Sequence, residues 1–193
     1  MSRNEPESER TDAPSRRPEG TLSAPASNGS HADARAYPIR YATEHGGFSL
    51  VPAVYVLLLD GDRVLLQRRA KTGYYDEFWA ASAAGHVESG ESVFDTALRE
   101  TTEELGVTLA LGDLEPLTVM HRTAAPGLPV DQRVDFFFAC RRWTGTPALQ
   151  EDKASDLRWF GLDQLPADVV HHERFVLERL REGALESITS FGF

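Results

Sequence analysis

Three glutamates near the middle of the chain have a spacing that suits metal chemistry. Glu100, Glu103 and Glu104 stand at positions i, i+3 and i+4, so on an α-helix their carboxylates point to one side. Acidic groups near a helix C-terminus oppose the helix dipole and repel one another, at about 0.2 to 1 kcal/mol each. A hard divalent cation such as Mg²⁺ prefers oxygen ligands and relieves that repulsion. An isolated acidic triplet is more often a solvated helix face than a metal site. The residues around the triplet must therefore show which of the two it is.

The residues around the triplet predict a well-delimited helix from Ser92 to Leu105. Ser92 is a good N-cap, and Asp95 three positions later completes a capping box. Gly106 suits the position after the last turn, where a positive φ carries no side-chain penalty. The stripe expected to face a sheet consists of Phe94, Ala97, Leu98, Thr101 and Leu105.

The whole segment from Gly85 to Val107 reads GHVESGESVFDTALRETTEELGV. It resembles the Nudix box, G-x5-E-x7-R-E-U-x-E-E-x-G-U, in which U is aliphatic. The fixed positions are filled by Gly85, Glu91, Arg99, Glu100, Glu103, Glu104, Gly106 and Val107. Thr101 departs from the pattern in an aliphatic slot, and we expect its hydroxyl to bond the carbonyl of Ala97.

Resemblance to the Nudix hydrolase family implies an α/β/α sandwich with a mixed β-sheet, in which the box forms a loop–helix–loop. It also implies cleavage of a diphosphate linkage in a nucleoside diphosphate joined to another group, by water attack on phosphorus with Mg²⁺ or Mn²⁺. A nucleoside triphosphate is the favoured substrate, because the domain is compact. The loop from Thr123 to Gln132 is where selectivity is expected to lie.

By the same resemblance, Glu103 and Glu104 hold the metal, and Glu100 is a further ligand or the base that deprotonates water. The carbonyl of Ala84 is the matching backbone ligand. A loop after the Phe-rich segment supplies one more carboxylate, for which Glu151 is the first choice and Asp152 the second.

Other residues near the box are assigned supporting roles. Gly85 and Gly90 permit loop conformations that other residues avoid, and Glu91 is expected to pair with Arg99. Arg68 and Arg69 either reach substrate phosphates or form an outward-facing pair. Tyr74, Tyr75, Phe78 and Trp79 offer a stacking surface, although core packing is an equal alternative for Phe78 and Trp79. His86 is interpreted as local structure, and His171-His172 as a surface pair.

Two other functions compete with hydrolysis. Isopentenyl diphosphate isomerase has a similar stretch, here Trp79 to His86, but places a catalytic cysteine directly before the Gly-His pair, where this chain has Ala84. A non-catalytic nucleotide-sensing domain is the second alternative. Such domains typically lose box carboxylates, and all are present here.

The remaining pattern predicts the elements that position the box. Apolar runs at 53–59 and 64–67 flank Asp60-Gly61-Asp62 and predict a hairpin. Short strands are expected at 78–82, 117–121, 134–140 and 157–160, and 134–140 should be central because it contains three consecutive phenylalanines. A second helix is expected over 173–182, ending at Gly183. Interleaved strands and helices favour an α/β sandwich.

The N-terminal region differs in composition from the rest. Its first 36 residues contain four Pro and six Ser, which predicts too little apolar surface for a folded core. We expect a disordered tail over residues 1–45 and a single Nudix domain over 46–193. Oligomeric state stays open between monomer and homodimer.

Charge and composition limit the possible partners. The net charge is −10, which argues against binding a nucleic-acid polymer or an anionic membrane. No apolar run approaches the roughly 20 residues that a spanning helix needs, and the single cysteine favours a reducing cytoplasm. The box alone contains six acidic residues and one arginine. We therefore expect bound cations to make the local charge of the box positive, so that a negatively charged nucleotide can bind there.

Overall fold

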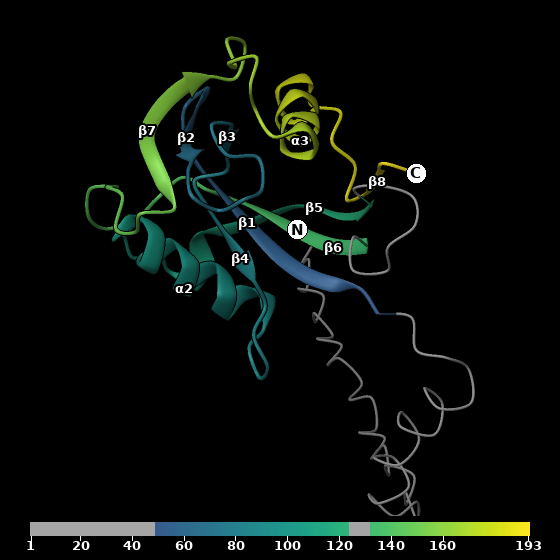
Figure 1. Cartoon of the computed structure of the whole chain (residues 1–193), viewed down its shortest axis with the longest axis horizontal. Coiled ribbons are helices and arrows are strands. Elements are labelled where there is room, and N and C mark those ends of the chain that lie inside the picture. Colours follow the sequence, from purple (N-terminus) through teal and green to yellow (C-terminus); the bar gives the residue numbers. More distant parts are fainter. Residues whose placement is uncertain (1–48, 124–131) are drawn as a thin grey trace, which may run out of the picture. The chain divides into compact units, whose positions relative to one another are not determined.

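A mixed β-sheet forms the centre of the computed structural model, which describes residues 49–123 and 132–193. The tail expected over residues 1–45, and most of the loop from Thr123 to Gln132, lie outside the described residues. Figure 1 shows the strands running between two helices, one on each side. The expected α/β fold with a mixed sheet is confirmed.

Eight strands make up the sheet. In chain order they are β1 (Val51–Asp60), β2 (Arg63–Arg69), β3 (Trp79–Ala80), β4 (Ala83–His86), β5 (Leu114–Thr123), β6 (Gln132–Cys140), β7 (Ala154–Gly161) and β8 (Ile188–Phe191). The main path is β3-β2-β1-β6-β5-β8, while β4 pairs with β1 and β7 with β2. The Phe-rich strand β6 is central as predicted, parallel to β1 and antiparallel to β5.

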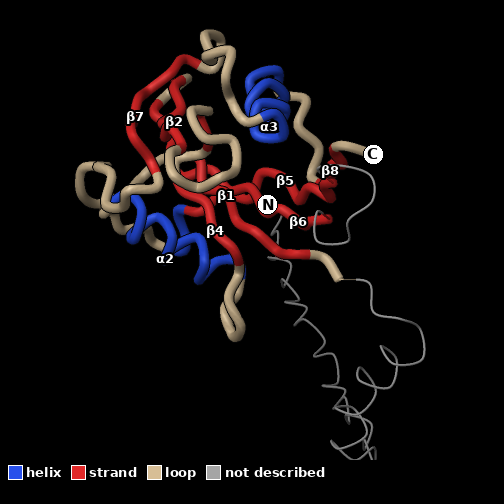
Figure 2. Tube along the Cα trace, in the orientation of Figure 1, coloured by secondary structure: helices blue, strands red, loops and turns tan. Residues whose placement is uncertain are grey.

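Two helices cover the sheet, and a short 3₁₀ turn, η1 (Leu111–Asp113), precedes β5. Alternate side chains of a strand point to opposite faces. Val54, Val56 and Leu58 of β1 therefore pack with Ala97 and Leu105 of α2 (Val93–Leu105). The intervening Tyr55, Leu57 and Leu59 pack with Val176 and Leu177 of α3 (His171–Glu182). Figure 2 shows the two helices on opposite sides of the strands.

The ends of α2 follow the sequence prediction closely. Ser92 Oγ accepts a hydrogen bond from the Asp95 amide, and the Asp95 carboxylate accepts one from the Ser92 amide, at 3.2 and 3.0 Å. Gly106 ends the helix with a φ of 67°. The Thr101 hydroxyl donates to the Ala97 carbonyl at 2.7 Å, as expected.

Several local expectations are wrong. Phe94, expected to face the sheet, is 39% exposed, although its ring lies 5.3 Å from that of Phe138. The second helix begins at His171, and His172 is buried against the hydroxyl of Tyr55 and is not a surface residue.

Strands β4 and β8 had no clear signal in the sequence, because both have four residues and β4 consists mainly of small ones. Neither helix of the described residues is both long and apolar enough to cross a membrane.

Candidate active site

The box is held together by the guanidinium of Arg99. Its Nε and Nη2 donate to the two carboxylate oxygens of Glu91 at 2.7 and 3.0 Å. Its Nη1 donates to Glu100 at 2.7 Å and to Glu103 at 3.1 Å. The hydrogen bond from Arg99 lowers the pKa of Glu91 to about 2. The expected Glu91–Arg99 pair is therefore present, and the same arginine also binds two of the three helix carboxylates.

Glu100 lies against Gly85 of β4. A Cβ on Gly85 would overlap the Glu100 carboxylate. The glycine at position 85 therefore leaves room for this carboxylate, and its role is not a positive φ, since the positive-φ glycines of the described residues do not include Gly85. Gly90 does have a positive φ, 93°, as its predicted loop role requires.

Glu104 is the most enclosed carboxylate of the triplet. Its Oε2 accepts hydrogen bonds from Gln67 Nε2 at 2.9 Å and from the Ala84 amide at 3.1 Å. Its pKa is raised to about 7, mainly by burial and also by the nearby charges of Glu100 and Glu151, against the lowering effect of its two hydrogen bonds. Ala84 thus contacts Glu104 through its N–H group, whereas the prediction concerned its carbonyl as a metal ligand.

The loop before β7 brings a further carboxylate to this helix end. The amides of Ala148 and Gln150 donate to the carbonyls of Leu105 and Glu104, each at 3.0 Å. This places the next residue, Glu151, close enough to Glu104 to raise its pKa. Glu151 forms an ion pair with Lys153 at 2.8 Å.

The second choice for that carboxylate, Asp152, points elsewhere. It pairs with Lys71 at 3.1 Å, and both side chains are largely exposed.

A cavity of about 430 Å³ connects these groups to the sheet. Its acidic side contains Glu88, Glu100 and Glu104, and the basic groups around it are Arg69, His86, Arg122, Arg133 and Lys153. Gln67, Thr72, Ala53, Ala84, Gly85, Tyr55, Tyr74 and Glu173 complete the wall. The cavity therefore brings carboxylates and guanidinium groups to one concave surface.

The two arginines singled out from the sequence are separated. Arg69 lines the cavity, where its Nε donates to the Tyr74 carbonyl at 2.9 Å. Arg68 does not line it; its side chain pairs with Glu77 at 3.1 Å.

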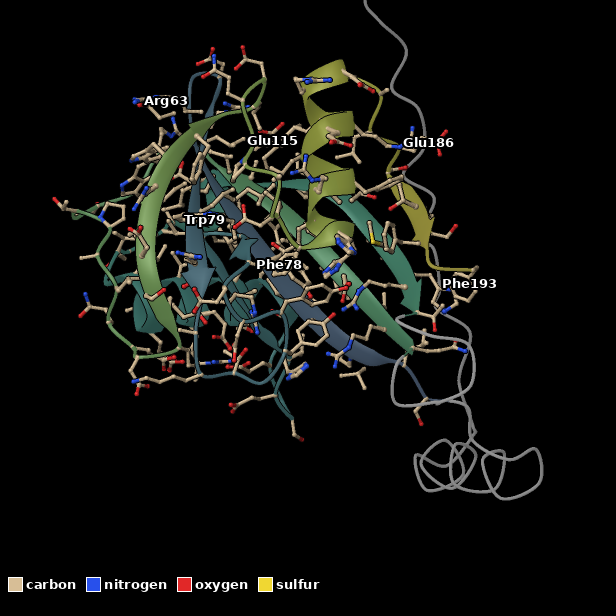
Figure 3. The ribbon with its side chains drawn as sticks, turned by 45° about the horizontal axis from the view of Figure 1, so that its top comes forward. Arg63, Phe78, Trp79, Glu115, Glu186 and Phe193 are labelled. Atoms are coloured by element: carbon tan, nitrogen blue, oxygen red, sulfur yellow. The ribbon has the colours of Figure 1, made fainter. Side chains whose placement is uncertain are left out.

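Trp79, labelled with Phe78 in Figure 3, is a core residue, 6% exposed and packed edge-on against Phe160. Of the four aromatic residues proposed for stacking, Tyr74 is the one that lines the cavity.

Sequence reasoning missed a buried polar group at the cavity wall, in which Arg122 and Glu173 line the cavity and Asp135 does not. Arg122 and Asp135 form an ion pair at 2.6 Å, with side chains 3% and 0% exposed. Glu173 accepts a hydrogen bond from the Ala81 amide, and burial raises its pKa to about 7. The available signal was a charged residue inside an otherwise apolar strand, as in the segment Val134 to Phe138.

As they stand, no three His, Cys, Asp or Glu side chains of the described residues converge closely enough to hold a metal ion. The donors nevertheless fit a hard divalent cation, because the carboxylates of Glu88, Glu100 and Glu104 line the cavity. Glu100 and Glu103 are bound to Arg99, and Glu151 to Lys153. A metal ion at this site would have to displace these ion pairs.

The family model for the NUDIX domain matches residues 49–180. A MutT NUDIX hydrolase from Burkholderia pseudomallei has a similar structure, with a TM-score of 0.60 and 29% identity over 68% of this chain and 98% of that one. The NAD-capped RNA hydrolase NudC of Pseudomonas aeruginosa is 36% identical over 119 residues, which are 61% of this chain and 38% of NudC. The chain thus spans well under half of that relative's length.

An isopentenyl-diphosphate Delta-isomerase of Cereibacter sphaeroides is 30% identical over 145 residues, covering 74% of this chain and 82% of the isomerase. The cysteine expected before the Gly-His pair of such an isomerase is replaced by Ala84 in this chain. The single cysteine, Cys140, is fully buried in β6 and does not line the cavity. The chain therefore belongs to the NUDIX domain family, as a Nudix-type pyrophosphohydrolase.

Proposed function

We propose that the protein hydrolyses the diphosphate linkage of a nucleoside diphosphate-X compound, with a nucleoside triphosphate as the first choice, by attack of water on phosphorus. The observation that carries this proposal is the cavity that Glu100 and Glu104 share with Arg69, Arg122 and Arg133. Carboxylates suit a metal ion that binds phosphate oxygens, and guanidinium groups bind the same oxygens directly.

Mg²⁺ or Mn²⁺ is the proposed cofactor. Glu100, Glu103, Glu104, Glu151 and the carbonyl of Ala84 would hold it. A bound divalent cation neutralises phosphate charge and makes water a better nucleophile.

The protein's own groups prepare this site. Gln67 and the Ala84 amide fix the orientation of Glu104, while Arg99 keeps Glu100 at the cavity wall beside Gly85. Arg69 is the proposed phosphate-binding residue of the Arg68–Arg69 pair, because Arg68 is bound to Glu77. Free nucleotides are preferred to polymers, because the chain has a net charge of −10.

The test is a substrate panel with Mg²⁺ or Mn²⁺ and product identification. It should contain nucleoside triphosphates, ADP-ribose, nucleotide sugars, dinucleoside polyphosphates, NAD-capped RNA and isopentenyl diphosphate. We expect hydrolysis of a free nucleotide that stops when EDTA removes the metal. Cleavage of the capped RNA alone would contradict the preference for free nucleotides, and isomerisation of isopentenyl diphosphate would replace hydrolysis as the activity. Nucleotide binding without turnover would favour a sensing domain.

Variants of the triplet test the assignment of the residues. Glu103→Gln and Glu104→Gln should each lower kcat by about 10²-fold or more, with an unchanged circular dichroism spectrum. Glu115→Gln is the matched control, because Glu115 is a surface residue of β5 that pairs with Arg141 and lies outside the cavity. Near-native rates in both triplet variants would contradict the proposed metal site.

A further inference from the structure

Two arginines stand directly opposite each other on neighbouring strands. Arg122 of β5 and Arg133 of β6 are cross-strand partners in the antiparallel ladder, and both line the cavity. Side chains opposite each other point to the same face, about 5 Å apart, and like charges in this arrangement destabilise a sheet. The repulsion between the two guanidinium groups therefore lowers the stability of the fold unless a nearby anion offsets it.

One of the two arginines is neutralised within the protein. Arg122 Nε donates to Asp135 at 2.6 Å, and both side chains are buried. The remaining contacts of Arg122 are long ones, 3.4 Å to the hydroxyls of Tyr74 and Tyr55. The carboxylate of Asp135 thus balances a single guanidinium.

Arg133 has no carboxylate partner in residues 49–123 and 132–193. Its Nη1 lies 2.6 Å from Nε2 of His86. In the described residues, the wall formed by Arg122, Asp135, Arg133 and His86 therefore has two guanidinium groups but one carboxylate, which is bonded to Arg122.

This positive wall adjoins the place proposed for the diphosphate. His86 follows Gly85, against which the Glu100 carboxylate lies, and Arg133 and Glu100 line the same cavity. A guanidinium group matches the geometry of phosphate oxygens and forms strong charge-assisted hydrogen bonds with them. If the diphosphate binds to a metal ion held by the carboxylates, a further anionic group of the same substrate can therefore lie at Arg133.

We propose that Arg133, held beside Arg122 and His86, binds an anionic group of X, the portion joined to the nucleoside diphosphate, and selects substrates in which X is charged. Nucleoside triphosphates, in which X is phosphate, are then preferred to compounds whose X is a neutral sugar. This inference rests on the proposed function and adds the residue that determines specificity within it.

The experiment uses substrate pairs that share a base: ATP with ADP-ribose, UTP with UDP-glucose, and GTP with GDP-mannose. For a pair that is turned over, the wild-type protein should have the higher kcat/KM for the triphosphate. Arg133→Gln should lower kcat/KM for the triphosphate by about 10- to 100-fold, mainly through KM, since one charge-assisted contact is lost. The value for the sugar compound should change by less than about twofold, because it makes no such contact.

Two further variants separate binding from structure. Arg133→Lys keeps the charge and should retain most of the preference. Arg141→Gln is the matched control, because Arg141 directly follows β6 but pairs with Glu115 outside the cavity; its substrate preference should equal that of the wild type. An equal loss for both members of a pair in Arg133→Gln, or a wild-type preference for the sugar compound, would overturn the inference.

A binding measurement keeps the inference testable if no substrate is cleaved and the proposed function fails. Inorganic tripolyphosphate is titrated into the full chain in the presence of Mg²⁺ by calorimetry. The wild-type protein and Arg141→Gln should bind it alike, and Arg133→Gln should bind it at least about tenfold more weakly. Equal affinities of wild type and Arg133→Gln would overturn the role of Arg133 whatever the activity.

Discussion

Replacing Glu173 with glutamine should change how the stability of the protein depends on pH. Glu173 lies in the first turn of α3, where it is 3% exposed. Burial is the main cause that raises its pKa from 4.5 to about 7. The folded state therefore holds this proton more tightly than the unfolded state, so the fold loses stability as pH rises from 4.5 through 7.

The size of the effect follows from the pKa difference. Each pKa unit corresponds to about 1.4 kcal/mol, so a rise from 4.5 to about 7 predicts a loss of about 3 kcal/mol by pH 8. Glutamine keeps the shape of the protonated acid and an oxygen that can accept the Ala81 N–H, but it does not ionise. Relative to the wild type, Glu173→Gln should thus gain about 3 kcal/mol between pH 4.5 and 8.

Urea denaturation of both proteins at several pH values measures this difference. Comparing the two proteins cancels the opposite contribution of His172, whose pKa is lowered well below its usual value by burial and which is present in both. Glu178→Gln is the control on the same helix, because its side chain is 46% exposed and pairs with Arg174 at the surface. If the difference for Glu173→Gln varied with pH no more than that for Glu178→Gln, the argument from burial would be refuted.

Three other substitutions test the packing of the site and the box. Gly85→Ala should displace the Glu100 carboxylate, which occupies the space of the new Cβ; we expect a large loss of kcat with a smaller loss in Tm, measured on the same preparation. Asp135→Asn leaves the Arg122 guanidinium buried without its counter-ion and should cost about 3 to 5 kcal/mol in urea denaturation. A loss below about 1 kcal/mol would show that water reaches this pair. Ser92→Ala removes the N-cap of α2 and should cost about 1 kcal/mol without changing KM.

The sequence predicted the box helix well because its determinants are local. The capping box at Ser92, the stop at Gly106 and the spacing of the glutamates each involve residues within a few turns of one another. The bond between Thr101 and Ala97 is of the same kind. Such features need no knowledge of the rest of the fold.

The basic side of the cavity could not be predicted in this way. Arg122 and Arg133 become neighbours through the register of β5 and β6. Glu173 and His172 are buried because α3 packs on the face of β1 that carries Tyr55. Two histidines at a helix start look like surface residues until that packing is known. These residues depend on long-range contacts, which periodicity and spacing do not contain.

The charge of the cavity differs from what the composition of the box indicates. Four acidic residues line it, Glu88, Glu100, Glu104 and Glu173, and four side chains that are cationic at neutral pH, Arg69, Arg122, Arg133 and Lys153. Burial raises the pKa values of Glu104 and Glu173 to about 7, so these two carboxylates carry less than their full negative charge at neutral pH. Asp135 cancels the charge of Arg122 from behind the wall.

The cavity is therefore close to electrical balance, although the chain has a net charge of −10. We expected bound cations to be needed to reverse a strongly negative site before a phosphate compound could approach. Within the box, Glu91, Glu100 and Glu103 are grouped around the single guanidinium of Arg99. The cations that balance the cavity, Arg69, Arg122, Arg133 and Lys153, come from outside the box. On the proposed function, a polyanionic substrate would meet a nearly balanced cavity with a positive side at Arg133. The proposed metal ion would then serve the chemistry at phosphorus more than the admission of the substrate.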